Sequence, residues 1–212
     1  MVIRVCYLKV MNKDRILRSG LILLAGISIS ALIAYAQISG YKTSTTQSVS
    51  GTNIGGPFSL TDQHGKPFTE KNLMGHYSLV YFGFTFCPAI CPTELQRINV
   101  ILKNLGPAGE KILPVFITID PARDTQKAMG AYVAQFNPRL IGLTGTQVQV
   151  DEALKAYKVY ARKVQDPNVS DYTMDHSTYL YLIGPNGKID QFFGPDAKAS
   201  EIADKIRTRI GA

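Results

Sequence analysis

Residues 78–95 read SLVYFGFTFCPAICPTEL, and this stretch decides the fold. Ser78–Phe84 is an apolar, aromatic run of strand length, which is typical of a central strand buried on both faces. Downstream, apolar residues recur at helical spacing: Leu95, Ile98, Leu102 and Leu105. Gly106-Pro107 ends that pattern. The sequence therefore predicts a strand, a loop that contains Cys87 and Cys91, and then a helix.

Pro92 indicates where this helix begins. A proline lacks the N–H that a helix interior uses, but it is well suited to the first helical position. We therefore expect the helix to start at Pro92, with Cys91 as its N-cap and Cys87 in the loop before it. Cys91 would then lie at the positive end of the helix dipole, which lowers the pKa of a thiol.

The rest of the chain alternates strand and helix patterns around this unit. Further strands are predicted at residues 112–119, 139–143, 179–183 and 189–193. Helices are predicted around residues 128–136, 146–157 and 199–210, and a small hairpin over residues 56–68. This order predicts a three-layer α/β domain with a mixed central sheet. The thioredoxin-like arrangement is the member of that class that places a cysteine pair where this chain has one.

Positive charge is concentrated at the N-terminus. The 212 residues carry a formal net charge of +7, of which +4 belongs to residues 1–20. The remainder of the chain has no basic cluster. Binding of nucleic acid is therefore not expected, because it requires a basic face on the folded domain.

An uncharged, apolar segment follows the basic residues. As a helix, residues 21–38 are long enough to cross a bilayer, and the basic residues 1–20 favour retention of that end in the cytoplasm. The alternative is a cleaved signal peptide that ends at Ala34-Tyr35-Ala36. Residues 39–54, rich in Ser and Thr, are predicted as a linker and residues 55–212 as the folded domain. Both interpretations place the domain outside the cytoplasm.

The chain contains three cysteines. Cys6 lies in the predicted cytoplasmic segment, so Cys87 and Cys91 form the pair that can act together. Their C-x-x-x-C spacing is one residue longer than that of the C-x-x-C redox motif. A structural disulfide is one interpretation in an exported protein, but a loop this short gains little stability from a cross-link. The flanking prolines and the helix start favour a pair with a chemical role.

Two thiolates need a further donor to form a metal site, and the candidates are the three histidines. His64 and His76 lie in polar connections and are predicted to be surface imidazoles. His176 precedes the predicted strand at 179–183, at the sheet edge where the cysteine loop is expected. The residues alone leave a metal ligand and a hydrogen-bonded loop histidine as equal alternatives there. Two thiolates and an imidazole suit Cu(I), and a Cys₂His set with an open position also holds zinc.

Several segments together resemble the Sco/SenC family. They are Tyr81–Leu95 (YFGFTFCPAICPTEL), Phe116–Thr125 (FITIDPARDT) and Asp175–Ser177 (DHS), with weaker matches at Gly55–Phe58 and Ile141–Gly145. They occur in the family's order and span about residues 55–193. Ala89 departs from the pattern, because many members have an acidic residue between the cysteines. The loss of a negative neighbour should slightly favour thiolate formation.

The resemblance implies a ligand set. The family's copper ligands fall on Cys87, Cys91 and His176. The family's Asp-Pro-x-Arg-Asp segment begins at Asp120, which is implied to be a weak fourth ligand or a residue that supports the ligands. The supporting residues implied beside it are Asp124 and Asp175. One copper ion per chain is expected, as Cu(I) or Cu(II).

The resemblance also implies a function. Members of this family are membrane-tethered thioredoxin-fold proteins that assist copper delivery to cytochrome c oxidase. The leading hypothesis is a copper metallochaperone, without enzymatic turnover, that loads the dinuclear copper centre of oxidase subunit II. The alternative is a thiol–disulfide reductase in which Cys87 and Cys91 keep the cysteines of that centre reduced. A peroxide-handling or redox-sensing role is weaker.

The same resemblance implies partners and a location. The partners are oxidase subunit II, a copper donor and a thiol reductant outside the cytoplasm, and the membrane through the N-terminal helix. The location is the bacterial periplasm or the mitochondrial intermembrane space.

Overall fold

The computed structural model describes residues 30, 35, 54–165 and 172–211. The predicted membrane segment at residues 21–38 lies outside the described residues, apart from Ser30 and Tyr35, which are helical. The predicted cytoplasmic segment and all of the predicted linker except Ile54 also lie outside them. Within the described residues, no helix combines the length and apolarity that a membrane span requires.

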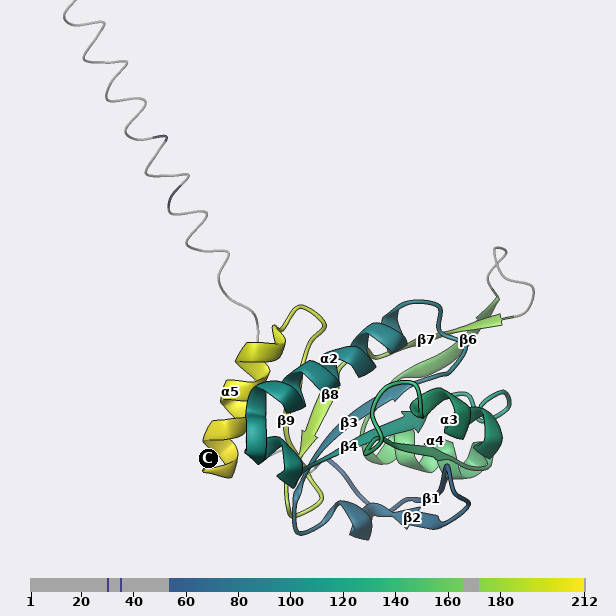
Figure 1. Ribbon diagram of the computed structural model, residues 1–212. Helices are drawn as coiled ribbons and strands as arrows, with labels where there is room; N and C mark the ends of the chain where they lie inside the picture. The colour runs from purple at the N-terminus through teal and green to yellow at the C-terminus, as the bar shows by residue number, and fades with distance from the viewer. Residues whose placement is uncertain (1–29, 31–34, 36–53, 166–171, 212) are drawn as a thin grey trace, which may run out of the picture. The chain divides into compact units, whose positions relative to one another are not determined.

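The folded part of the chain is built on a seven-stranded sheet (Figure 1). In spatial order its strands are β2 (Pro67–Thr69), β1 (Ser59–Asp62), β5 (Ile141–Thr144), β4 (Ile112–Thr118), β3 (Tyr77–Gly83), β8 (Leu180–Ile183) and β9 (Ile189–Phe193). β3, β4 and β5 run parallel, while β1 and β8 join this group antiparallel. The prediction of a mixed sheet is therefore confirmed, and β3 is an interior strand whose side chains are buried on both faces.

Helices cover both faces of the sheet. The helices are α2 (Ile90–Leu105), α3 (Gln126–Val133), α4 (Gln147–Ala156) and α5 (Ala199–Ile210), with short 3-10 helices η1 (Glu70–Leu73) and η2 (Gly106–Lys111). Side chains alternate along β3, so that Tyr81 contacts Cys91 of α2, whereas Phe82 contacts Tyr157 at the end of α4. α2 and α4 therefore lie on opposite faces, and α5 packs beside α2 (Figure 1).

The boundaries of α2 differ from the prediction at one end. Gly106 ends the helix with a φ of 60°, as its position after the apolar pattern predicted. The helix begins at Ile90 rather than at Pro92, and Ala89 is its N-cap. Pro92 is thus the third helical residue. This position is compatible with proline because the N–H groups of the first turn have no partner within the helix.

A second, two-stranded sheet was not predicted. β6 (Ala161–Gln165) pairs antiparallel with β7 (Tyr172–His176), and the two strands form a ribbon separate from the main sheet (Figure 1). Its strands are half-buried or exposed throughout, so they lack the continuous apolar pattern of β3. His176 is the last residue of β7, not a loop residue before β8.

Candidate metal centre

Three elements bring the predicted ligands together. Cys87 follows β3, Cys91 lies in the first turn of α2, and His176 ends β7. The Cys91 N–H donates to Cys87 Sγ at 3.3 Å, and Cys91 Sγ lies 3.9 Å from His176 Nε2. Both cysteines are free thiols; Cys87 is 8% exposed and Cys91 is fully buried. The structure therefore places a reduced, shielded dithiol beside an imidazole.

The separation of one pair of donor atoms, Cys91 Sγ and His176 Nε2, suits a shared metal ion. Protein ligands bond such ions at about 2.0–2.3 Å, so two ligand atoms of one ion lie about 3.3–4.0 Å apart at tetrahedral or trigonal angles. The 3.9 Å separation of Cys91 Sγ and His176 Nε2 falls in that range. In the described part of the chain, no three His, Cys, Asp or Glu side chains lie close enough together to hold a metal ion as they stand. Two sulfurs and one nitrogen are the donors that soft copper and zinc ions prefer.

The two thiols differ in acidity. The Cys91 thiol donates a hydrogen bond to the Cys87 sulfur, and the backbone N–H groups of Ala89, Ile90 and Cys91 also donate to this sulfur. Burial acts in the opposite direction, but these donors together lower the pKa of Cys87 to about 5. The pKa of Cys91 is raised, because its proton is held by Cys87 and because the side chain is buried. The prediction that Cys91 has the lowered pKa is therefore wrong. The main reason is that the Cys91 thiol donates to Cys87, and the earlier start of α2 adds free N–H groups that are directed at Cys87.

The His176 ring is oriented by a backbone carbonyl. Its Nδ1 lies 2.9 Å from the carbonyl oxygen of Ser177, which can only accept a hydrogen bond. Nδ1 therefore carries the proton, and the lone pair of Nε2 faces Cys91. Burial lowers the pKa of His176, which keeps the imidazole neutral and available as a ligand. Asp175 is exposed and pairs with Arg162 at 3.9 Å, so this carboxylate does not hold the ring.

Asp120 and Asp124 support the loops around the site. Asp120 accepts hydrogen bonds from the Tyr172 hydroxyl at 2.9 and 3.1 Å and is paired with Arg123. Asp124 accepts from the N–H and hydroxyl of Thr85 and from the Thr118 hydroxyl at 2.6 Å, while burial raises its pKa. The Asp120 oxygens implied as a weak fourth ligand are thus engaged by Arg123 and Tyr172.

Two residues of β3 shape the site and were missed by sequence reasoning. The Tyr81 hydroxyl donates to Cys91 Sγ at 4.0 Å, and the Tyr81 ring lies edge-on to His176. Gly83 leaves room for Cys91, since a Cβ atom there would lie 2.8 Å from the sulfur. Alternation along β3 was the available signal, because Tyr81 and Gly83 share one face of the strand.

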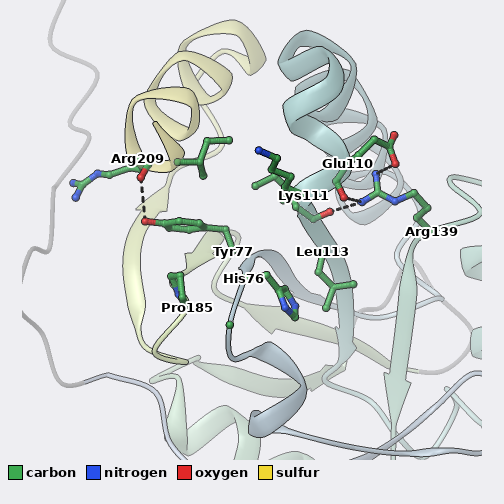
Figure 2. Close-up of a pocket in the computed structure, with 11 residues that line it drawn as sticks. His76, Tyr77, Glu110, Lys111, Leu113, Arg139, Pro185 and Arg209 are labelled. Atoms are coloured by element: carbon green, nitrogen blue, oxygen red, sulfur yellow. Dashed lines mark hydrogen bonds and ion pairs between the residues drawn. The ribbon is translucent and has the colours of Figure 1, made fainter. Parts of the chain in front are cut away.

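A separate cavity of about 690 Å³ lies at the amino ends of β3 and β4 (Figure 2). Its lining includes His76 and Tyr77 at the start of β3 and Lys111 before β4, whereas the cysteines follow the end of β3. No cysteine lines this cavity, so it is not the metal site. His64 is exposed, as predicted for a surface imidazole. His76 is half-buried, and its Nε2 is enclosed without a hydrogen-bond partner among the described residues, so the prediction of a surface imidazole is wrong for His76.

A thioredoxin-like α/β domain that holds a reduced dithiol beside a neutral imidazole is a thiol-based metal-binding or redox domain. The SCO1/SenC family model matches residues 46–211, and the chain belongs to that family. The protein SCO2, mitochondrial, of Saccharomyces cerevisiae is 47% identical over 162 residues, which cover 75% of this chain and 54% of the yeast protein. The chain spans little more than half the length of the mouse, yeast and human relatives it matches.

Solved structures agree with this assignment. Arabidopsis thaliana ScoI with copper bound matches with a TM-score of 0.71 at 41% identity, and covers 74% of this chain and 98% of that chain. A more distant structure, BsSco, has a TM-score of 0.59 at 25% identity over 76% of this chain and 97% of that one. BsSco is described as a member of the Sco family of cytochrome c oxidase assembly proteins and as having a disulfide switch.

Proposed function

We propose that this protein binds one copper ion through Cys87, Cys91 and His176 and delivers it during assembly of cytochrome c oxidase. The observation that carries the proposal is the lone pair of His176 Nε2, which faces the sulfur of Cys91 at 3.9 Å. Dithiol exchange does not need an imidazole in this position, whereas a three-donor copper site does. The copper bound by the Arabidopsis relative supports the same assignment.

The environment of the thiols suits copper that must be released again. Cys87 is deprotonated near neutral pH, so it binds a metal ion without first losing a proton. It also lies at the surface edge of the site, beside the exposed side chains of Phe86 and Ile90, whereas Cys91 is fully buried. An incoming thiolate of a recipient can therefore reach a metal ion from the Cys87 side. The recipient we propose is the dinuclear copper centre of oxidase subunit II.

Anaerobic titration of the reduced protein with Cu(I) against a competing chelator tests the proposal. We expect one tightly bound ion per chain, and loss of that binding after oxidation of Cys87 and Cys91 to a disulfide, because thiolates are the ligands. His176→Ala should weaken binding about 10–100-fold, the usual loss at a metal-site position. Undiminished affinity of the oxidised protein would place the site elsewhere and overturn the proposal.

Thiol–disulfide reduction is the second candidate, and the low pKa of Cys87 favours it. A thiolate with a pKa of about 5, next to a second thiol, has the arrangement of a reactive redox pair. The two functions respond differently to His176→Ala. Reduction would continue without the imidazole, whereas copper delivery would fail. Oxidase assembly in copper-limited cells that carry only this variant, at normal protein level, therefore decides between them.

A further inference from the structure

His176 is carried by a ribbon that is not part of the main sheet. β6 pairs only with β7 in the described residues, so the ribbon has no ladder of hydrogen bonds to the seven-stranded sheet. At one end of β7, the His176 ring rests against Tyr81 and Phe84, with ring centroids 6.2 and 5.9 Å apart. The other end begins at Tyr172. Next to His176, the Ser177 N–H donates to the Tyr160 carbonyl oxygen at 3.0 Å, so contacts at Tyr172 are what fixes the far end of the strand.

Arg123 makes that connection. Its Nη1 donates to the Tyr172 carbonyl oxygen at 2.9 Å, and its guanidinium carbon lies 3.8 Å from the centre of the Tyr172 ring. Its Nε is paired with the Asp120 carboxylate, which also accepts from the Tyr172 hydroxyl. A stacked, charged guanidinium over an aromatic ring is attractive, and a lysine cannot reproduce its planar set of donors.

The same guanidinium also reaches the cysteine loop. Its carbon lies 4.8 Å from the centre of the Phe86 ring, and Phe86 directly precedes Cys87. It lies 5.8 Å from the ring of Phe84, which contacts His176. Arg123 thus contacts both the segment that carries the sulfur donors and the strand that carries the nitrogen donor. The Arg123 side chain is only 15% exposed.

We propose that Arg123 is a positioning residue that clasps the β6–β7 ribbon onto the cysteine loop and thereby sets the distance between His176 and the thiols. This inference rests on the proposed function, because it assigns Arg123 a role toward the copper that the three donors bind. Tyr172 and His176 lie four residues apart on one face of β7, so a displacement at Tyr172 tilts the strand and withdraws the imidazole. Without the clasp, the site reduces to two thiolates.

A double-mutant cycle on Cu(I) affinity tests this inference. We expect Arg123→Lys and Arg123→Ala each to weaken Cu(I) binding about 10-fold, the low end of the range for residues that orient metal ligands. In the His176→Ala background the same substitutions should have no further effect, because Arg123 acts through the imidazole. Additive losses would show that Arg123 supports the fold rather than His176, and unchanged affinity of both single variants would equally overturn the inference.

A second measurement needs no metal. In the metal-free protein the His176 ring protons lie against the Tyr81 and Phe84 rings, so their nuclear magnetic resonance shifts report on the position of the ribbon. Arg123→Lys, which retains the charge and protects the fold, should move these shifts toward those of a free histidine. Shifts identical to those of the unmodified protein would overturn the inference even if Arg123→Ala did not fold.

The matched control is Arg162→Ala. Like Arg123→Ala, it removes one positive charge, here from strand β6 of the ribbon. Arg162 is exposed, however, and its pair with the exposed Asp175 is long, at 3.9 Å. We expect neither the Cu(I) affinity nor the His176 shifts to change. If the unmodified protein and this control both fail to bind Cu(I), the proposed function fails; if they bind and the cycle is additive, only the role of Arg123 fails.

Discussion

At the scale of single residues, the sulfur of Cys87 takes the place that a serine or aspartate oxygen holds at most helix starts. The Cys91 thiol, which is the main donor, and the N–H of Cys91 both donate to it, which explains why the lowered pKa belongs to Cys87 and not to the cysteine inside the helix. The position of Pro92 could not reveal this from the sequence, since proline is compatible with any position in the first turn. Only the observed start of α2 at Ile90 shows that its free N–H groups face the sulfur of Cys87.

Alkylation of the metal-free, reduced protein should therefore be selective and dependent on pH. At about pH 7 Cys87 should react with iodoacetamide much faster than Cys91, because only Cys87 is largely deprotonated. Its rate should fall as the pH is lowered through about 5, where Cys87 takes up a proton. Mass spectrometry of quenched samples measures both rates. Cys91→Ala should move the fall to higher pH, since the Cys91 thiol is the main donor to Cys87; an unmoved profile would contradict this account.

A second prediction at this scale is the effect of Gly83→Ala on stability. In Gly83→Ala the new methyl group would lie 2.8 Å from Cys91 Sγ and 2.9 Å from Phe116, so the core must shift. We expect a loss of about 1–3 kcal/mol in the free energy of unfolding, measured with urea. Gly130→Ala, in helix α3, is the control: its Cβ would meet only ordinary contacts at 3.7 Å, and it should be neutral or stabilising. Equal effects of the two substitutions would refute the packing argument.

At the scale of elements, sequence periodicity predicted the strands and helices that bury an apolar face, but it missed the largely exposed β6–β7 ribbon. The strands and helices of the main domain follow apolar patterns that are visible in the sequence, and α5 begins and ends at the predicted residues. The β6–β7 ribbon has no such pattern, because its two strands are stabilised mainly by each other and by contacts such as that of Arg123 with Tyr172. The cysteines could thus be placed from local sequence. For His176 the residues alone left a metal ligand and a hydrogen-bonded loop histidine as equal alternatives, and only the family resemblance favoured the ligand.

The attachment of α2 to the loop before α5 is a testable feature of this arrangement. Arg97 donates to the carbonyl oxygens of Gly194, Pro195 and Ala197 and pairs with buried Glu94 at 2.7 Å. Arg97→Ala leaves the Glu94 carboxyl and these carbonyls without their donor. We expect a loss of about 3–5 kcal/mol in thermal or urea unfolding.

An exposed ion pair provides the control for Arg97. Arg207→Ala on α5 removes an arginine whose pair with Asp204 is largely open to solvent, so it should cost less than about 1 kcal/mol. A loss for Arg97→Ala as small as that for Arg207→Ala would show that the buried pair contributes little.

At the scale of the whole molecule, the candidate metal centre and the cavity of Figure 2 lie at opposite ends of strand β3. The dithiol follows the carboxyl end of β3, where loops from several elements converge, and the cavity lies at the amino ends of β3 and β4. The chemistry therefore occupies one end of the domain. The remaining prediction at this scale concerns the N-terminal basic residues and the apolar segment. Apart from Ser30 and Tyr35, they lie outside the described residues.

The N-terminal sequence predicts that the domain is exported. Basic residues before Leu21 and the uncharged run after Arg18 should keep the N-terminus in the cytoplasm. A reporter that matures only outside the cytoplasm, fused after Ala212, should therefore be active in bacterial cells. A cytoplasm-specific reporter at the same position is the control and should be silent. The opposite pattern would reverse the predicted orientation.

The spacing of the three donors along the chain has a consequence for folding. Cys87 and Cys91 are four residues apart and meet as soon as α2 begins to form, whereas His176 lies 85 residues beyond Cys91. Contacts of such large sequence separation form late, after the loop entropy between them has been lost. A chain still emerging or partly folded can therefore offer a metal ion two sulfurs but no imidazole. Under the proposed ligand set, only chains that have finished folding present all three donors, so the candidate metal centre would distinguish native molecules from unfinished ones.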